Sequence, residues 1–209
     1  MAGKNDMKIA VLGAGNIGGT LSKKWAKAGH EVVFGVRDVS SPKVQALLET
    51  IEGEASADTI ANAIAFGEVV VLAIPGKEVE AVVQTYADIL HGKIIIDATN
   101  KFGSPEMSGM AVLAAKVPGA KPFRAFNSLG WENFAEPQFG QIQADLLYCG
   151  ADNEARPIVE ELIAEVGLRP VRVGDLDQIQ LVDSLGALWA ALVFGQGMGR
   201  HLAFKVLTA

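Results

Sequence analysis

The chain has 209 residues and a mass of 22.0 kDa, half of its residues are hydrophobic, and its formal net charge at pH 7 is −6. This length allows one well-buried α/β domain with at most a small appendage, and the acidic balance argues against a nucleic-acid or anionic-membrane partner. One cysteine, Cys149, excludes an internal disulfide and a Cys-based zinc site, so we predict no metal site.

The N-terminal segment predicts a dinucleotide-binding unit. The apolar strand KIAVLG, residues 8–13, leads into Gly13, Gly15 and Gly18 in the spacing G-x-G-x-x-G, and a helix is expected over residues 17–28. The first glycine of this pattern makes a tight turn, the second lets the backbone approach a pyrophosphate, and the third lets the helix pack close to the strand. The pattern alone is weak, but a strand before it and a helix after it are the context it requires.

The second strand, EVVFGV over residues 31–36, ends without the acidic residue that is usual in NAD-binding units. About 20 residues beyond the glycines, an Asp or Glu normally holds the ribose 2′-hydroxyl, but this place falls on Gly35 or Val36, and Arg37 follows. A guanidinium can bind a 2′-phosphate through two hydrogen bonds and stack on adenine. We therefore predict that the cofactor is NADP(H) rather than NAD(H).

Neighbouring polar residues bear on this cofactor choice. Ser40, Ser41 and Lys43 can assist phosphate binding. Two alternatives stay open: Arg37 is a solvated strand-end residue paired with Asp38, or Asp38 is itself the ribose acid, displaced by a few positions. Either alternative would remove the argument for a bound 2′-phosphate.

Further apolar runs predict a doubly wound α/β fold, a parallel sheet with helices on both faces. The runs are nearly continuous rather than alternating, which is typical of parallel strands that are covered on both sides. They lie at residues 69–75, 93–100, 123–128, 145–150 and 169–174. Helices are expected at residues 41–51, 59–66, 77–90, 105–115, 154–166 and 178–206.

The carboxyl ends of three of these strands carry candidate ligand-binding residues, because open α/β sheets bind ligands at this edge. LAIP would line the cofactor, DATN would approach the nicotinamide ribose or carboxamide, and FNSLGW ends at the same edge. An ordinary turn-forming role is the alternative for each. The residues are Ile74 and Pro75 from LAIP, Thr99 and Asn100 from DATN, and Asn127 and Ser128 from FNSLGW.

No candidate general acid stands out. His30, His91 and His201 do not lie at a predicted strand end, Lys101 is the one lysine at this edge, and no Tyr-x-x-x-Lys pair exists. Carbonyl reduction needs a proton donor beside the hydride acceptor, usually Tyr, Lys or His. Hydride transfer to a stacked flavin-type ring needs no such residue, since the cofactors supply the chemistry. The sequence therefore favours a ring acceptor and predicts no catalytic side chain.

The last predicted helix, residues 178–206, carries apolar side chains around most of its circumference, more than one face of a sheet can cover. We expect this surface to be buried in a homodimer, and the alternative is that the segment folds back into the chain's own core. Gly195, Gly197 and Gly199 predict a kink or a close approach within it. Its most apolar part is shorter than the about 20 residues of a membrane span, so no membrane contact is expected.

Four segments, which together cover nearly the whole chain, carry a family resemblance. They are GAGNIGGTLSKKWAKAGHEVVFGVRD, FNSLGWENFAEP, CGADNEARPIVEELIAEVGLRPVRVGDL and LVDSLGALWAALVFGQGMGRHLAFKVL. They resemble the NADPH-dependent coenzyme F420 reductases, or deazaflavin:NADP oxidoreductases, and the related cytosolic reductase domains of STEAP metalloreductases. The resemblance implies a Rossmann domain, a small C-terminal cap, homodimers, and NADP held at Gly13, Gly15, Asn16, Ile17, Gly18 and Arg37.

The resemblance does not name the acceptor. Deazaflavin-reducing members carry a proline-containing pattern where this chain has DATNKFG and FNSLG, and the Asn-rich version here is closer to the flavin-using relatives. Residues 1–150 are expected to form the NADP-binding Rossmann domain, and residues 151–209 a small C-terminal cap and dimerisation segment on the same domain. The cofactor-binding set also includes Val36, Ser41, Lys43, Ile74, Pro75, Thr99 and Asn100, and the substrate-binding set is Asn127, Ser128 and Leu129.

These features together predict an NADP(H)-dependent oxidoreductase that moves hydride between nicotinamide and a flavin or deazaflavin (F420-like) acceptor. The N-terminal MAGKNDMK has no apolar core, so no signal peptide is expected and the predicted location is the cytoplasm. One alternative is a reductase of a small imine or carbonyl substrate. The other is a redox sensor that binds NADP without turnover.

Overall fold

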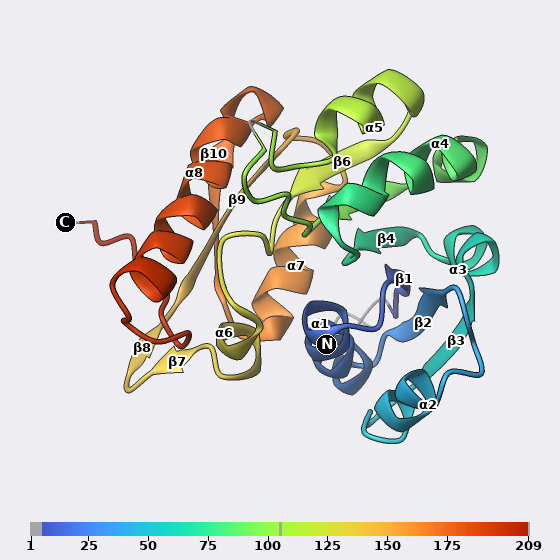
Figure 1. The fold of residues 1–209 in the computed structure, drawn as a ribbon, viewed down its shortest axis with the longest axis horizontal. Helices are drawn as coiled ribbons and strands as arrows, with labels where there is room; N and C mark the ends of the chain where they lie inside the picture. The colour runs from blue at the N-terminus through green and yellow to red at the C-terminus, as the bar shows by residue number, and fades with distance from the viewer. Residues whose placement is uncertain (1–5, 105, 209) are drawn as a thin grey trace.

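Eight strands form one sheet in the computed structural model, which describes residues 6–104 and 106–208 (Figure 1). Their order across the sheet is β10-β9-β6-β5-β4-β1-β2-β3, and neighbours pair in parallel except β6 and β9. The predicted doubly wound α/β fold is confirmed, with one reversed pairing that the apolar runs did not indicate. The strands are β1 (Lys8–Leu12), β2 (Glu31–Val36), β3 (Ala55–Thr59), β4 (Val69–Leu72), β5 (Ile94–Asp97), β6 (Lys121–Arg124), β9 (Asp145–Gly150) and β10 (Arg169–Gly174).

Helices cover both faces of this sheet, so successive residues of its central strands enter two different cores. In β1, Ile9 and Val11 belong to the core that includes α1 and α7, whereas Ala10 and Leu12 belong to the core with α3, α4 and α5. Burial on both faces explains the nearly continuous apolar runs. The helices are α1 (Asn16–Ala28), α2 (Pro42–Leu48), α3 (Ile60–Phe66), α4 (Val79–Leu90), α5 (Met110–Lys116), α6 (Trp131–Ala135), α7 (Arg156–Val166) and α8 (Ile179–Ala190).

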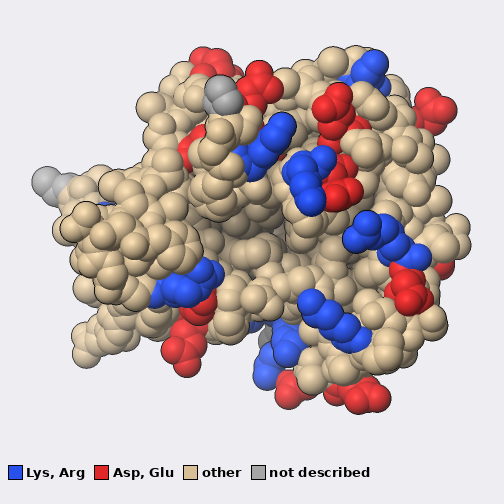
Figure 2. All heavy atoms as spheres, viewed as in Figure 1, with Lys and Arg blue, Asp and Glu red and all other residues tan. Residues whose placement is uncertain are grey.

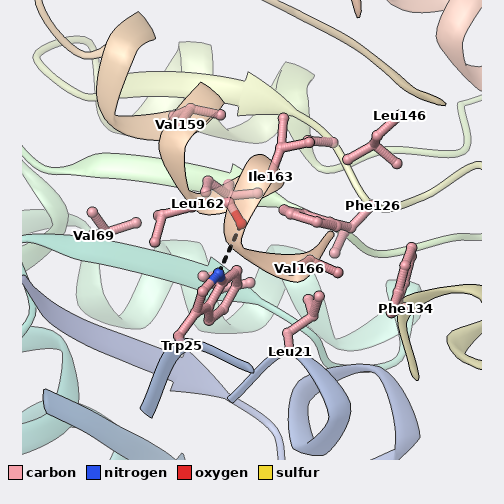
Figure 3. Close-up of a cluster of buried hydrophobic side chains, with 14 of the residues drawn as sticks. Leu21, Trp25, Val69, Phe126, Phe134, Leu146, Val159, Leu162, Ile163 and Val166 are labelled. Atoms are coloured by element: carbon pink, nitrogen blue, oxygen red, sulfur yellow. Dashed lines mark hydrogen bonds between the residues drawn. The ribbon is translucent and has the colours of Figure 1, made fainter. Parts of the chain in front are cut away.

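Trp25 of α1 ties the C-terminal part of the chain to the glycine-rich unit. Its side chain is fully buried, and its indole Nε1 donates a 3.0 Å hydrogen bond to the carbonyl of Leu162 in α7 (Figure 3). The Trp25 ring also packs edge-on against Phe126, which in turn packs against Phe134 of α6. The residues that follow position 150 therefore share the main core with the strands that precede it.

Several short elements are present that the sequence patterns did not predict. Strand β3, with the sequence ASADT, is an edge strand without a fully buried residue, so it lacks an apolar run. Helix α6 is one short turn after FNSLG, and β7 (Gln138–Phe139) and β8 (Ile142–Gln143) form a separate two-stranded hairpin. The helix expected from residue 105 begins at Met110; residue 105 itself lies outside the described residues.

The prediction of one helix over residues 178–206 is wrong. Helix α8 ends at Ala190, one π-type turn continues to Gly195, and the chain from residue 196 to residue 208 is not helical. Gly197 and Gly199 have φ of 68° and 82°, in the left-handed region that glycine adopts at little cost. These glycines therefore turn the chain back toward the sheet, where Phe204 forms a β-bridge with Asp145.

Within the described residues, the stretch Leu176–Gly195 is long and apolar enough to cross a membrane when judged by length and composition alone. In the structure it packs on the fold through Val182, Trp189 and Val193, all of which are buried. Its Asp183 carboxylate pairs with the buried Arg124 guanidinium. Because of these contacts, we interpret the stretch as a helix that packs within the α/β fold rather than as a membrane span.

Candidate active site

The three glycines of the G-x-G-x-x-G pattern lie between β1 and α1 and have three different surroundings. Gly13 has a φ of 109°, and a Cβ there would lie 2.6 Å from the carbonyl oxygen of Ala73. A Cβ on Gly18 would lie 2.2 Å from the carbonyl oxygen of Gly13, so only glycine lets the helix pack this closely. A Cβ on Gly15 would meet nothing within 4 Å. Gly15 thus borders open space at the start of α1, where a pyrophosphate can approach the backbone.

A cleft of about 450 Å³ runs from this loop to the end of β2. It is lined by backbone of the glycine loop, by the polar residues that follow β2, and by the apolar end of β4. Gly35 belongs to this wall because a Cβ there would lie 2.5 Å from the Leu12 side chain. The sequence-predicted residues that line the cleft are Gly13, Gly15, Val36, Arg37, Ser41, Lys43, Ile74 and Pro75.

Arg37 projects from this cleft wall with no hydrogen bond or ion pair among the described residues. Asp38 does not pair with it; instead, Asp38 Oδ1 accepts hydrogen bonds from the backbone N–H and hydroxyl of Ser40, at 3.0 and 2.7 Å. Lys43, which lines the same cleft, is likewise without a protein partner in the described part of the chain. Figure 2 shows basic side chains around the hollow in this face of the molecule, although the net charge of the chain is −6.

A second, smaller cavity of about 160 Å³ lies farther along the strand ends. It shares Ala73 and Ile74 with the larger cleft, so the two follow one another across the sheet. Its other lining residues are Ile17, Ala98, Thr99, Asn100, Phe126 and Leu129. The structure thus brings together sequence-predicted residues from the glycine loop, LAIP, DATN and FNSLG. None of the eight residues that line this cavity has a titratable side chain.

A buried polar network supports the wall of the smaller cavity from behind. Arg124 at the end of β6 is fully buried, and its Nη1 donates to the carbonyl oxygens of Asp97 and Thr99 at 3.1 and 2.5 Å. Its Nη2 donates to Asn100 Oδ1 at 3.0 Å, and its Nε donates to Asp183 Oδ1 of α8 at 2.8 Å. One guanidinium therefore positions Thr99 and Asn100, two of the three DATN residues that line the cavity.

Asp97 completes this arrangement at the end of β5. Its Oδ1 accepts hydrogen bonds from the N–H and hydroxyl of Thr99, at 2.9 and 2.7 Å, and its Oδ2 accepts one from the N–H of Gly109 at 2.6 Å. The sequence reasoning missed Arg124, Asp97 and Asp183. A signal existed for Asp97, which is a charged residue at the end of the otherwise apolar run IIID.

Asn127 and Ser128 are 3% and 1% exposed, and they lie behind the cavity wall rather than on it. Asn127 Nδ2 donates to Asp183 Oδ1 at 3.3 Å, and the Asn127 carbonyl accepts a 2.7 Å hydrogen bond from Asn100 Nδ2. Phe126, just before them, has a φ of 62°, a conformation uncommon for a bulky residue. This turn directs Phe126 and Leu129 to the cavity and the two polar side chains inward.

The titratable residues singled out in the sequence lie elsewhere. His30 is buried, accepts a hydrogen bond from the N–H of Met7 at Nδ1, and contacts Glu165 through Nε2 at 2.6 Å. His201 stacks on Phe139 with ring centroids 4.3 Å apart. Burial raises the pKa of the Cys149 thiol to about 11, so it stays protonated at neutral pH. These side chains therefore pack against other residues of the fold and line neither of the two cavities.

The chain is similar to known reductases in sequence and in fold. Residues 8–101 match the model of the family described as NADP oxidoreductase, coenzyme F420-dependent. The F420-dependent NADP reductase of Methanothermobacter marburgensis is 28% identical over 204 residues, which cover 87% of this chain and 90% of that protein. The rat metalloreductase STEAP3 is 28% identical over 187 residues, 87% of this chain, but the chain spans only 37% of its length.

A solved structure from Arthrobacter sp. FB24, described provisionally as an F420-dependent NADP reductase, superposes with a TM-score of 0.83. It is 26% identical in sequence, and the match covers 97% of this chain and 100% of that one. The glycine loop and all residues that line the larger cleft lie within the segment matched by the family model. On these grounds the chain is similar to the coenzyme F420-dependent NADP oxidoreductases, and it is an NADP-dependent oxidoreductase.

Proposed function

We propose that the chain transfers hydride between NADP(H) and a flavin or deazaflavin ring that lies against the nicotinamide. The observation that carries this proposal is the composition of the smaller cavity, which brings no titratable side chain to its surface. A carbonyl or imine substrate needs a proton donor at the reacting atom. A flavin-type ring does not, because it takes its second proton from water once the hydride has been added.

The residues present fit the dinucleotide. The space beside Gly15 leaves room for a pyrophosphate at the N-terminus of α1, where the helix dipole favours negative charge. We propose that Arg37, assisted by Ser41 and Lys43, binds the 2′-phosphate, because Arg37 and Lys43 lie in the same cleft without protein partners among the described residues. Ile74 and Pro75 would cover the part of the cofactor that lies between its 2′-phosphate and its nicotinamide.

At the other end, the cavity residues would hold the nicotinamide and orient the acceptor. NADPH, when bound, supplies a hydride, two electrons with one proton, which the acceptor ring takes up with a proton from water, leaving NADP+. Thr99 and Asn100 are kept in place by Arg124 and Asp97, and the apolar side chains of Ile17, Phe126 and Leu129 would exclude water from the reacting faces. Asn127 and Ser128 would act by supporting this wall.

The acceptor is tested by a panel of compounds under anaerobic conditions. We expect steady loss of the NADPH absorbance with riboflavin, FMN or a 5-deazaflavin, and no loss with cyclic imines or small aldehydes. The variant Leu129→Trp, which fills the cavity, should abolish turnover, whereas Lys27→Ala, on the exposed end of α1, should not change it. Turnover of an imine or aldehyde alone would favour the carbonyl-type reductase, and NADPH binding without any turnover would favour the sensor.

A further inference from the structure

The buried network behind the smaller cavity contains more negative than positive charge. Its charged members are the guanidinium of Arg124 and the carboxylates of Asp97 and Asp183, so one positive and two negative charges leave −1 when both acids are ionised. The Arg124 Nη1 to Asp97 Oδ1 distance is 3.4 Å, and the Arg124 Nη2 to Asp183 Oδ1 distance is 2.7 Å. The side chains of Arg124 and Asp97 are fully buried, and that of Asp183 is 7% exposed.

The two carboxylates are not equally well compensated. Asp97 accepts three hydrogen bonds from neutral N–H and O–H donors in addition to the contact with Arg124. Asp183 shares Arg124 with it, at shorter distances, but within the described residues it accepts only one hydrogen bond from a neutral donor, that of Asn127 Nδ2 at 3.3 Å. Burial raises the pKa of Asp183, Arg124 only partly offsets this, and the nearby Asp97 charge adds to the increase in pKa. A further cation close by would therefore stabilise the Asp183 carboxylate.

The smaller cavity is the place next to this network where a ligand charge would be felt. Arg124 and Asp97 hydrogen-bond directly to Thr99, which lines the cavity, so a single layer of residues separates these two charges from its contents. Asp183 contacts that layer through Arg124 and Asn127. Most of the remaining wall is apolar, formed by residues such as Ile17, Ala98 and Phe126. Charges in such surroundings interact more strongly than they do in water.

We propose that the Arg124–Asp97–Asp183 cluster stabilises the positively charged nicotinamide of NADP+ relative to the uncharged ring of NADPH, and so favours hydride donation to the acceptor. The proposal rests on the proposed binding of the nicotinamide in this cavity, but not on the identity of the acceptor. In this view α8 contributes to redox chemistry by carrying a charge, although it has no residue on the cavity surface.

The test compares the dissociation constants of NADP+ and NADPH, measured without any acceptor at pH 8. Asp183→Asn keeps the shape of the side chain and removes its charge. We expect it to weaken NADP+ relative to NADPH by roughly three- to tenfold, because a buried charge close to a largely apolar cavity is lost. Asp152→Asn, which removes an exposed carboxylate near α7, should leave this ratio unchanged. Asp183→Glu, which keeps the charge, should retain the wild-type ratio.

If Asp183 had only a structural role, Asp183→Asn would weaken the binding of NADP+ and NADPH equally. That result would overturn the proposal. If Asp183→Asn does not melt cooperatively, the wild-type protein decides: NADP+ should bind more tightly than 1,4,5,6-tetrahydro-NADP, whose ring is uncharged. Equal or weaker binding of NADP+ would contradict the proposal. Failure of the wild type to bind either NADP+ or NADPH would instead remove the proposed function itself, so the two failures are distinguishable.

Discussion

At the scale of single residues, the end of β2 bears on the choice of cofactor. Arg37 follows this strand where NAD-binding proteins place an acid, and its guanidinium makes no hydrogen bond or ion pair within the described residues. Replacing it by alanine should lower NADPH affinity roughly ten- to a hundredfold, because a charge-assisted contact to the 2′-phosphate is lost. NADH affinity should hardly change. Fluorescence titration of both cofactors measures this, with Lys27→Ala as the charge-matched control.

Equal binding of NADH and NADPH by the wild-type protein would show that the cleft does not select the 2′-phosphate. An equal loss of both cofactors in Arg37→Ala would mean that the guanidinium stabilises the cleft itself. In either case Arg37 would not be the residue that selects NADP(H).

No side chain in the smaller cavity can act as a general acid or base, which leads to a second residue-level prediction. Lys101→Ala and His201→Ala should change the rate of acceptor reduction by much less than the roughly 100- to 10,000-fold typical of losing such a group. His201 stacks on Phe139 and contacts the Glu136 carbonyl, so the rate is measured on variants whose NADPH binding is intact. A loss of the larger size would point to a carbonyl or imine substrate.

At the scale of elements, Asp145 at the start of β9 holds the C-terminal segment on the sheet. Its carboxylate is fully buried and accepts hydrogen bonds from Arg169, Lys205 and the N–H of Val206. Burial alone would raise the pKa of Asp145, but these donors outweigh it and lower the pKa to about 2. The ordinary pKa of the group is 3.8, so the ionised form is favoured by folding.

The depressed pKa predicts how stability depends on pH. The contribution of Asp145, about 2 kcal/mol, is complete above pH 4 and is lost as the pH falls toward 2. Asp145→Asn should therefore lower the free energy of unfolding at pH 7 by about this amount and expose Lys205 to trypsin. Urea unfolding at pH 7 and pH 3 measures this decrease in the free energy of unfolding, with Asp152→Asn as the control. If the variant lost the same free energy of unfolding at both pH values, the role of the charge would be contradicted.

The elements that could be predicted from the sequence are those whose local chemistry is strong. The buried parallel strands and the glycine turn follow from apolar runs and glycine spacing, and helices such as α7 lie between these runs. Strand β3 and the β7–β8 hairpin could not, because they are short and largely exposed. The predicted helix runs beyond the end of α8 because the apolar composition of this segment outweighs Gly197 and Gly199, whose left-handed backbone turns the chain away from a helical path.

In the candidate site, too, residues that are positioned by their neighbours in sequence could be predicted, and residues that are positioned by distant parts of the chain could not. The glycine loop, Arg37 and the strand ends that line the cavities could be predicted, since their positions depend on residues near them in sequence. The inward orientation of Asn127 and the network around Arg124 could not. They depend on Asp183, 59 positions beyond Arg124, and therefore on how α8 packs.

At the scale of the whole molecule, the surface around α8 favours a homodimer, which we retain as a proposal. Leu181, Leu188, Phe194 and Met198 are between 47% and 66% exposed, an unusual number of large apolar groups for one segment. Trp189 and Val193, by contrast, are buried in the protein's own core and are therefore not available for an interface. Only the exposed subset is available for an interface.

Sedimentation at micromolar concentration should give a mass of about twice 22.0 kDa. Phe194→Glu combined with Leu188→Glu should dissociate this species, because two charges would be buried without partners. Leu207→Glu, at an apolar position that is 85% exposed but lies outside α8, serves as the control. A stable wild-type monomer would refute the dimer, and a dimer unaffected by the double variant would place the interface elsewhere.

The most direct test of the central claim, hydride transfer between nicotinamide and a ring held against it, follows the transferred hydrogen itself. NADPH carrying deuterium at the transferable C4 position is mixed with the protein and a 5-deazaflavin, whose reduced C5 keeps its hydrogen without exchange. The account predicts that mass spectrometry finds the deuterium at C5 of the reduced deazaflavin, with no deuterium released to water. Reduction of the deazaflavin with hydrogen from solvent at C5, or no reduction at all, would contradict it.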